Sequence, residues 1–422
     1  MRTPIALVAA CAAAILAAAP LRAGEGITVG EEQVLLEDGP GKGLQATPTV
    51  AFGKDVYLAV WREGWHGRGG KARIYAARVD KSGKVLDAKG IEVAPCEKGV
   101  QTAPRVAFGG GAFLVVWQDL RNGKDYDILA AHVSAGGDVL DKEPIALAVA
   151  PRTQALPDVA SDGKAFLVVW QGLKGDGTKH LGYAAPVGAD GKAGAIVETG
   201  AAPQPKIAWN GENYLVVFGA STLLSYRLGP DGKRVDPGRK SWDGQVVRAH
   251  KQSDFSVTGA PAKGWLAVNH RSPPDYWGWG GPGAMRCYLV GPDGKRDPGI
   301  KKEPSGVQSK QPNWLDLGRS KKAGATWPMG ANAVAWDGKQ FVAVWQRHHI
   351  EKTVMFTNCD LIASRVDGFR PLDDAGVAVA ASAEEEKNPA LASDGAGALL
   401  CVYERHGKDG KVRISARTLK TQ

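Results

Sequence analysis

The sequence repeats one block seven times, and this repetition constrains the fold more than any other feature. Each copy is a short apolar run that follows a turn and ends in an aromatic residue or its substitute. The copies lie about 57 residues apart, so seven of them fill the chain beyond residue 23. The seven runs are Val56–Trp61, Phe113–Trp117, Phe166–Trp170, Tyr214–Phe218, Trp265–Asn269, Phe341–Trp345 and Leu399–Tyr403.

Each run has the composition of a strand that is buried on both faces, because it is rich in β-branched and aromatic residues and is bounded by Gly or Asp. Tight turns such as Asp162-Gly163 join the strands, and no amphipathic helix is evident. Four strands can be assigned in each copy; those of the second copy are 105–108, 113–117, 128–133 and 144–149. The sequence therefore predicts an all-β fold, a seven-bladed β-propeller of four-stranded antiparallel blades.

The two ends of the chain predict how the ring closes. The seventh copy stops after its third strand, Val412 to Leu419, and lacks a fourth. The segment 26–29, which precedes the first copy, is similar to the fourth-strand segment 90–93. We therefore expect the N-terminal segment to complete the last blade, which protects the edge strands of the ring.

The first 23 residues have the pattern of a secretory signal peptide. Arg2 supplies the positive charge, residues 5–19 are apolar, and Leu21-Arg22-Ala23 offers a small residue for cleavage. The apolar run is too short to span a membrane. We expect a signal peptide at 1–23, one propeller domain at 24–422, and a secreted or periplasmic, monomeric protein.

The four remaining cysteines carry no recognisable redox or metal motif. Cys96, Cys287, Cys359 and Cys401 have no CxxC, CxxCH or zinc-ligand spacing. Cys287 and Cys359 lie near the third strands of adjacent blades, so that a disulfide between them is one option. The histidines also lack ligand spacing, except for the adjacent His348 and His349. We expect no cofactor and no metal.

The positive charge of the chain does not indicate a nucleic-acid partner. The formal net charge is +9, but the basic residues are dispersed and the protein is predicted to be exported.

Two insertions break the repeat, at about 272–284 and 300–330. Strand parity places them on one face of the propeller, which we call the upper face; it carries the loops between strands two and three and the connections between blades. Aromatic residues in or beside these insertions predict a platform on which sugar rings stack. These residues are Tyr276, Trp277, Trp279, Trp314 and Trp327. Alternatively, they form the core of a small apolar cap.

Three groups of arginine and histidine follow strand two in the neighbouring blades five, six and seven. Together they predict a basic sector that attracts carboxylate or sulfate, to which arginine can bind through two hydrogen bonds. The residues are His270, Arg271, Arg347, His348, His349, Arg405 and His406. The alternative is that they are scattered loop residues with local hydrogen bonds. A pair for acid–base catalysis would need Glu404 or Glu63 beside His348 or His406, and the spacing selects none.

One phrase recurs in the copies: a Pro followed by Val-Ala, a Gly turn, Phe-Leu-Val-Val-Trp and then Gly-Lys-Val-Leu-Asp. It resembles the repeats of secreted bacterial β-propeller proteins. The resemblance covers the chain beyond residue 23 and implies a fold and a compartment, but no activity. Sialidase-like propellers have a related architecture. Their Ser-x-Asp-x-Gly-x-x-Trp box is missing, because the segment from Ser161 to Trp170 has the wrong spacing.

These observations lead to three functional hypotheses. The first is an extracellular, non-catalytic binding propeller whose ligand is an anionic glycan on the upper face. The second is a glycan-cleaving lyase or hydrolase that uses the same funnel. The third is a scaffold that binds a secreted protein.

Overall fold

The structure of the protein is a computed structural model. It describes residues 26–67, 70–173, 180–200, 202–219, 222–236, 247–248, 254–271, 284–295, 315–317, 326–351, 354–367, 370–373 and 376–422. The predicted signal peptide and most of the insertions predicted at about 272–284 and 300–330 lie outside these ranges.

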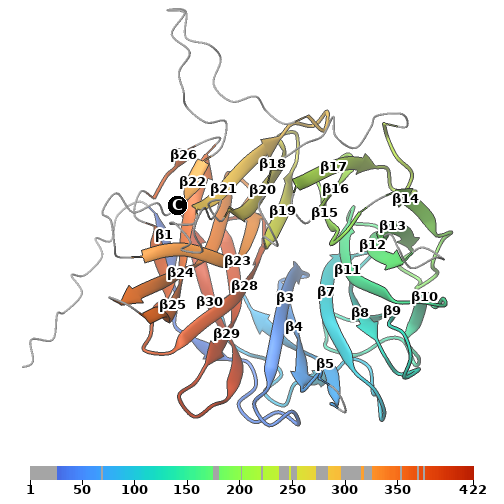
Figure 1. Ribbon diagram of the computed structural model, residues 1–422, viewed down its shortest axis with the longest axis horizontal. Helices are drawn as coiled ribbons and strands as arrows, with labels where there is room; N and C mark the ends of the chain where they lie inside the picture. Colours follow the sequence, from blue (N-terminus) through green and yellow to red (C-terminus); the bar gives the residue numbers. More distant parts are fainter. Residues whose placement is uncertain are drawn as a thin grey trace, which may run out of the picture.

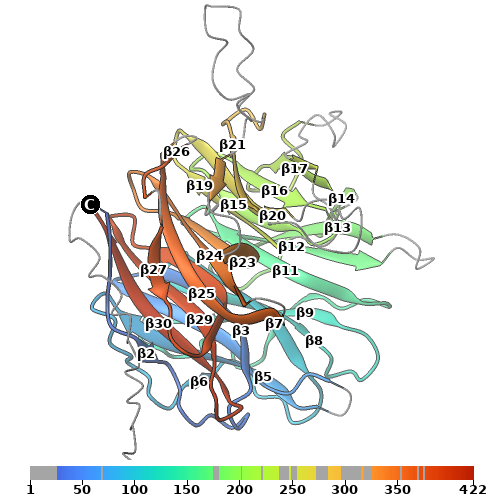
Figure 2. The ribbon, with the colours of Figure 1, turned by 60° about the vertical axis from the view of Figure 1, so that its left-hand side comes forward.

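Seven antiparallel sheets follow one another around a ring in chain order, from the blue blade one to the red blade seven (Figures 1 and 2). Blade one contains β3 (Gln45–Gly53), β4 (Val56–Gly64), β5 (Ala72–Asp80) and β6 (Ile91–Glu92). Blade two contains β7 (Gln101–Gly109), β8 (Ala112–Asp119), β9 (Asp127–Val133) and β10 (Ile145–Ala148). Blade three contains β11 (Gln154–Ser161), β12 (Phe166–Leu173), β13 (His180–Val187) and β14 (Val197–Gly200). Blade four contains β15 (Lys206–Trp209), β16 (Tyr214–Phe218), β17 (Thr222–Leu228) and β18 (Val247–Arg248).

Blades five to seven complete the ring. Blade five contains β19 (Phe255–Ala260), β20 (Gly264–Arg271), β21 (Ala284–Val290) and β22 (Leu315–Leu317). Blade six contains β23 (Thr326–Trp336), β24 (Phe341–Glu351), β25 (Val354–Asp367), β26 (Arg370–Pro371) and β27 (Val377–Ala380). Blade seven contains β28 (Glu385–Ser393), β29 (Ala398–His406) and β30 (Val412–Thr421). The predicted seven-bladed propeller is confirmed. No helix in the described part of the chain has the length and apolar character needed to cross a membrane.

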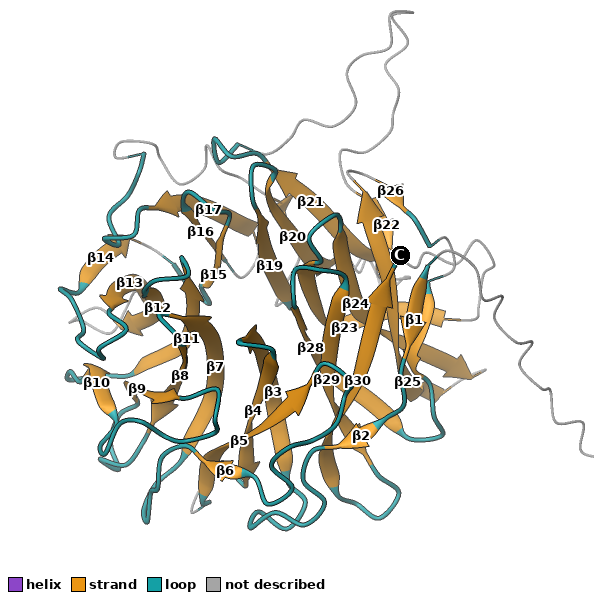
Figure 3. Cartoon of the chain, turned by 180° about the vertical axis from the view of Figure 1, so that it is seen from behind, coloured by secondary structure: helices purple, strands orange, loops and turns teal. Residues whose placement is uncertain are grey.

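The predicted closure of the ring by the N-terminal segment is also confirmed. Strand β1 (Ile27–Val29) pairs antiparallel with β30, with Ile27 opposite Thr421. Strand β2 (Gln33–Val34) pairs with the same strand further along. Figure 3 shows both short strands beside β30. The two ends of the chain therefore share one sheet, and blade seven gains its outer strand.

The tryptophans that end strand two pack the blades against one another. Trp61, Trp117, Trp170 and Trp345 are all buried. Trp117, for example, packs among Val60 and Ile74 of the preceding blade. Each of the first three also donates its indole N–H, as Trp117 does to the carboxylate of Asp119 at 2.9 Å. This burial confirms a packing role for these residues.

Ion pairs repeat on the lower face, where strands three and four of each blade are joined. Arg78 binds Asp87 at 2.8 Å, and its Nη1 also donates to the carbonyl of Ala135 in the next blade. In blade two the same position holds His132, whose Nδ1 lies 3.0 Å from a carboxylate oxygen of Asp141. The equivalent arginine pairs are Arg227–Asp236 and Arg365–Asp373. We call these the lower-face ion pairs. Arginine thus links the turn of its own blade to the next blade.

In five blades, a left-handed residue lies at the start of the innermost strand, at the upper face: Thr47, Ala103, Leu156, Gln204 and Asn388. Where its N–H donates to the side chain that follows the aromatic residue of strand two in the preceding blade, we call the interaction the junction bond. Four junctions have it: Gln118 with Leu156 (3.0 Å), Gln171 with Gln204 (2.9 Å), Gln346 with Asn388 (3.1 Å) and Glu404 with Thr47 (2.8 Å). The φ of these four donors is 51–56°. A conformation that is costly for non-glycine residues thus recurs with a bond that supports it.

The suggested disulfide between Cys287 and Cys359 does not form, and no disulfide joins any of the four cysteines in the described ranges. Cys287, Cys359 and Cys401 are buried in the blades. Burial raises the pKa of Cys359 and of Cys401 to about 12, so that both thiols stay protonated.

Candidate functional site

The innermost strands of the seven blades surround a central cavity of about 470 Å³ at the upper end of the ring. In each strand, the residue opposite the one that precedes the strand-two aromatic residue or its substitute lines this cavity. The seven residues at this position, in blade order, are Thr49, Arg105, Asp158, Lys206, Ser256, Ala333 and Ala390. One structural position thus holds charged residues in blades two to four and small residues elsewhere.

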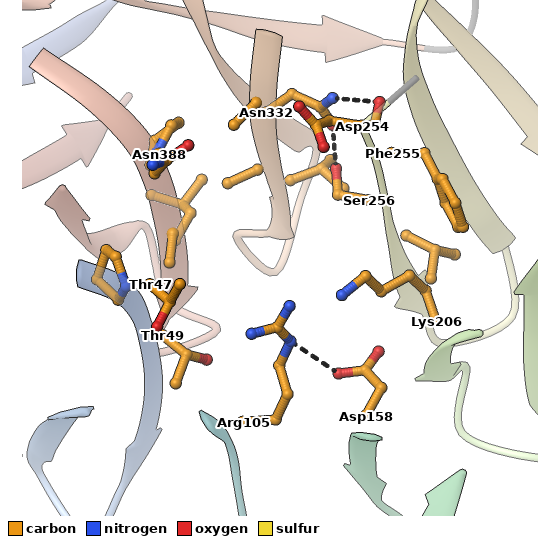
Figure 4. A pocket seen from close by; sticks show the side chains of 18 of the residues that line it. Thr47, Thr49, Arg105, Asp158, Lys206, Asp254, Phe255, Ser256, Asn332 and Asn388 are labelled. Atoms are coloured by element: carbon orange, nitrogen blue, oxygen red, sulfur yellow. Dashed lines mark hydrogen bonds and ion pairs between the residues drawn. The ribbon is translucent and has the colours of Figure 1, made fainter. Parts of the chain in front are cut away.

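Four of the lining residues form a charged cluster: Arg105, Asp158, Lys206 and Asp254. Figure 4 shows the side chains of Arg105, from blade two, and Lys206, from blade four, extending toward the middle of the cavity. A smaller cavity of about 260 Å³ is lined by three of the same residues, Arg105, Lys206 and Asp254. We refer to these four residues as the charged cluster.

Arg105 and Asp158 form an ion pair in the charged cluster. The guanidinium Nε of Arg105 lies 3.6 Å from Oδ1 of Asp158. The other oxygen of Asp158 accepts the backbone N–H of Ile207 at 2.9 Å. Asp158 is therefore held from two sides, while Arg105 presents part of its guanidinium to the cavity.

Lys206 has no such partner. Within the described ranges, no hydrogen bond or ion pair reaches its ammonium group. Burial, together with the charge of Arg105, lowers the pKa of Lys206 to about 8, although Asp158 and Asp254 act in the opposite direction. A positive charge in this place lacks full compensation, so an added anion would be favoured there.

Asp254 lies just before strand β19, on the other side of Lys206. Burial raises its pKa, and the nearby Lys206 only partly offsets this effect. Its backbone carbonyl accepts a hydrogen bond from the side-chain amide of Asn332 at 3.1 Å, which fixes the backbone at the cavity wall. The charged form of this carboxyl group is therefore less favoured beside Lys206 than that of an exposed aspartate.

The cluster contains donors for an anion and lacks a metal-binding arrangement. Arg105 and Lys206 supply positive hydrogen-bond donors, and Ser256 and Thr49 add hydroxyl groups to the wall. Within the described part of the chain, no group of three or more His, Cys, Asp or Glu side chains is arranged to hold a metal ion.

The aromatic side chains predicted from the insertions lie outside the part of the structure that is described. Tyr276, Trp277, Trp279 and Trp314 lie outside the described residues. Trp327 is in strand β23, but its side chain is not among those described. The aromatic platform therefore stays a prediction.

The predicted basic sector contains acidic partners in blade six. The backbones of His270, Arg271 and His349 lie in strands β20 and β24, outside the described side chains. Arg347 is paired with Asp360 at 2.9 Å across β24 and β25.

His348 lies in the same strand as Arg347. Its Nε2 is 3.8 Å from the sulfur of the buried Cys359. Both described residues of this group therefore contact groups of their own blade.

Blade seven shows the same neutralisation. Arg405 forms ion pairs with Glu32 and Glu384. The Nε2 of His406 lies 3.2 Å from Glu404, whose other oxygen accepts the junction bond of Thr47. Glu404 and His406 are thus adjacent, but the carboxylate has a structural role.

Sequence reasoning missed the charged cluster because it concentrated on long loops. A signal was present: the residue after the strand-one proline reads Thr, Arg, Asp, Lys and Ala in the five copies that have this proline. A repeat position that changes from small to charged, within an otherwise apolar strand, indicates a surface that does not pack against another blade.

No protein-family model and no curated protein matches the sequence. The fold is similar to that of solved propellers. A sialidase from Trypanosoma rangeli is 9% identical, with a TM-score of 0.47, and the match covers 93% of this chain and 60% of that one. An acylaminoacyl peptidase from Pyrococcus horikoshii is 9% identical, with a TM-score of 0.47 and coverage of 88% and 50%. The protein BT0996, solved as an RGII complex, is 10% identical, with a TM-score of 0.39 and coverage of 93% and 92%.

The chain thus spans about 60% or less of the length of the sialidase and peptidase chains that it matches. At such low identity, the similarity concerns the propeller fold alone, which many unrelated functions share.

Proposed function

We propose that the protein is an extracellular, non-catalytic binding propeller whose charged cluster holds the acidic group of an anionic glycan. The observation that carries this proposal is the ammonium group of Lys206, which extends into the central cavity beside Arg105 without a partner among the described residues. A carboxylate or sulfate between the two side chains would compensate both positive charges.

The shape of the site supports a ligand larger than a free ion. Two cavities share Arg105, Lys206 and Asp254, and the larger one, of about 470 Å³, has the usual size of a small-ligand site. The cavity lies at the upper end of the ring, the face to which strand parity in the sequence assigns the insertion with Trp277 and Trp279. An acidic sugar in the cavity would leave the rest of a glycan chain near those loops.

A panel of acidic oligosaccharides tests this function. It consists of oligogalacturonate, hyaluronan and chondroitin sulfate fragments, each beside its methyl-esterified or desulfated form. We expect at least one acidic member to bind more tightly than its neutralised form, and the binding to weaken with salt because the ion contacts are screened. Arg105→Ala and Lys206→Ala should each weaken it about tenfold, since a charge-assisted contact contributes about 1.5 kcal/mol or more.

Two outcomes would make us abandon the proposal. One is a panel in which no acidic glycan is preferred to its neutral counterpart. The other is a preference that both cavity variants leave unchanged. Thr49→Ala, a lining residue without charge, serves as the matched control.

Glycan cleavage at the same cavity is a second candidate, because two carboxyl groups there have different environments. Asp158 is bound to Arg105 and to a backbone N–H, whereas burial raises the pKa of Asp254. Such a difference suits a base and an acid, respectively. Prolonged incubation with the same panel, followed by assays for reducing ends and unsaturated sugars, separates the two: products that disappear in Asp254→Asn support cleavage, and intact glycans support binding alone.

A further inference from the structure

The carboxylate of Asp158 fixes Arg105 and Lys206 relative to each other. Its Oδ1 lies 3.6 Å from Nε of Arg105, and its Oδ2 accepts the N–H of Ile207, the residue directly after Lys206, at 2.9 Å. Lys206 also follows Pro205, a residue with a fixed φ, which stiffens the backbone before it. The two cations come from blades two and four, and both are supported by one carboxylate of blade three.

Part of the guanidinium of Arg105 is left for a ligand. Its Nη1 donates to the carbonyl of Pro104 at 2.7 Å, and its Nε faces Asp158. Within the described ranges, its Nη2 forms no hydrogen bond or ion pair. The N–H groups of Nη2 can therefore bind a carboxylate oxygen in the cavity. Because the side chains of Arg105 and Lys206 both extend toward the middle of the cavity, such a carboxylate would lie beside the amino group of Lys206 (Figure 4).

The amino group of Lys206 has the properties of a nucleophile. It lines the cavity, and no hydrogen bond or ion pair with a described residue occupies its nitrogen. With a pKa of about 8, roughly a tenth of these groups are neutral at pH 7, against less than about a thousandth for an ordinary lysine. A desolvated lysine beside another cation is one of the arrangements that activate the amine toward carbonyl groups.

The cavity also contains a group that can transfer a proton. Asp254 lines both cavities together with Lys206, and its side chain forms no hydrogen bond or ion pair with a described residue. Its raised pKa keeps more of it protonated than an ordinary aspartate at the same pH. Blades six and seven contribute Ala333 and Ala390 to the wall, where an alkyl group fits without the loss of a polar contact.

We propose that Lys206 binds 2-oxo acids covalently, as an imine, while Arg105 holds their carboxylate. A 2-oxo acid carries its carboxylate next to its carbonyl carbon, so that the contact with Arg105 brings the carbonyl to the amine.

The reaction balances without an oxidant or a reductant. The neutral amine of Lys206 attacks the carbonyl carbon, and a proton moves from the nitrogen to the oxygen to give a carbinolamine. Asp254 then protonates the hydroxyl group, which leaves as water while the nitrogen forms a double bond to the carbon. The product is a protonated imine, and the carboxylate of Asp254 regains its proton from solvent.

This activity goes beyond the proposed binding of glycans, because it uses the neutral form of Lys206 instead of its cation. Its test contains no glycan, so either proposal can fail without the other.

Reductive trapping with pyruvate tests the imine. Sodium cyanoborohydride converts an imine into a stable carboxyethyl-lysine, which peptide mass spectrometry assigns to individual lysines. We expect Lys206 to be labelled about tenfold faster than Lys192, or more. Lys192 is the matched reference, because it is 87% exposed and its hydrogen bond with Asp190 raises its pKa. Lys206→Met should lose this label and leave that of Lys192 unchanged. Labelling of Lys206 no faster than that of Lys192 would overturn the imine.

Methyl pyruvate tests the contact with Arg105, because it has the same carbonyl group without the charge. With the label of Lys192 as the internal reference, Lys206 of the wild type should prefer pyruvate about tenfold, and Arg105→Ala should remove the preference. Thr49→Ala, an uncharged change in the same wall, should leave it unchanged. A wild type without the preference, or a preference that Arg105→Ala retains, would overturn the role of Arg105.

Discussion

The lower and upper ends of the propeller use the same repeated backbone for different purposes. At the lower end, the same pairing recurs: Arg78, Arg227 and Arg365 each bind an aspartate of their own turn and a carbonyl of the next blade. At the upper end, the backbone is equally regular, with a bulge and a left-handed residue in several blades, but the side chains differ. Positions that repeat in both geometry and residue type hold the ring together. Positions that keep the geometry but change the residue type are where we place binding.

Removal of a repeated core tryptophan should have the largest effect on stability. Trp117→Ala creates a cavity between blades one and two, and we expect a loss of about 3–5 kcal/mol in the free energy of unfolding. Trp65→Ala is the matched control at the upper face, where the side chain is 56% exposed, and should change stability by less than about 0.5 kcal/mol. Urea denaturation followed by circular dichroism measures both. Similar losses for the two variants would contradict the division between repeated and variable positions.

A lower-face ion pair should contribute less than a core tryptophan but more than the charged cluster. Arg78→Ala removes the bonds to Asp87 and to Ala135, and we expect a loss of about 2 kcal/mol. Arg105→Ala, in the charged cluster, should cost less than about 1 kcal/mol, because Asp158 keeps its backbone partner. The same denaturation assay compares them. If Arg105→Ala were the more destabilising variant, the cluster would be structural.

The pH dependence of binding should show whether Lys206 acts as a cation. The pKa of Lys206 is about 8, so the ammonium is mostly charged at pH 7 and mostly neutral at pH 9. We expect the affinity for an acidic glycan to fall about tenfold between these values, and Lys206→Arg to abolish the fall because arginine stays charged. Calorimetry at constant ionic strength measures this. A flat profile for the wild type would exclude Lys206 from the contact.

Stability should change in the opposite direction over an adjoining pH range. The pKa of Lys206 is lower in the folded protein than its ordinary value of 10.5. Between about pH 8 and 10.5 the unfolded chain therefore binds more protons than the folded one, and the contribution of Lys206 to stability rises with pH. Lys206→Met should remove this contribution, which melting curves from pH 8 to 10.5 would reveal.

The left-handed residues of the bulges should show the smallest effect. Leu156→Gly removes the strain of φ 52° and keeps the junction bond of its N–H, but glycine also increases the entropy of the unfolded chain. We expect these terms to offset each other to within about 1 kcal/mol. Val159→Gly, in the regular part of the same strand, should be clearly destabilising. Equal losses at the two positions would show that the left-handed conformation carries no strain.

The repeat in the sequence was sufficient to predict the fold, because burial between blades requires the same apolar run in every copy. The closure of the ring could be predicted because the seventh copy lacks a fourth strand and the segment before the first copy is similar to one. In the structure, Ile27 of that segment is opposite Thr421. The site was harder to predict, because its residues are far apart in the chain and become neighbours only in the ring. Asp360 and Glu32 form ion pairs with Arg347 and Arg405, and Glu32 precedes the first copy of the repeat, far from Arg405 in the chain. Arg62 directly follows Trp61 in the sequence. That it occupies the position of a hydrogen-bond acceptor is recognisable only when the junction bonds of the other blades are known.

The central claim is that the charged cluster binds the acidic group of a glycan, and one titration addresses it directly. Isothermal titration calorimetry compares the tightest acidic member of the oligosaccharide panel with its neutralised form, on the wild type and on the double variant Arg105→Ala, Lys206→Ala. We predict that the wild type prefers the acidic form and that the double variant binds both forms equally weakly. An undiminished preference in the double variant would contradict the claim.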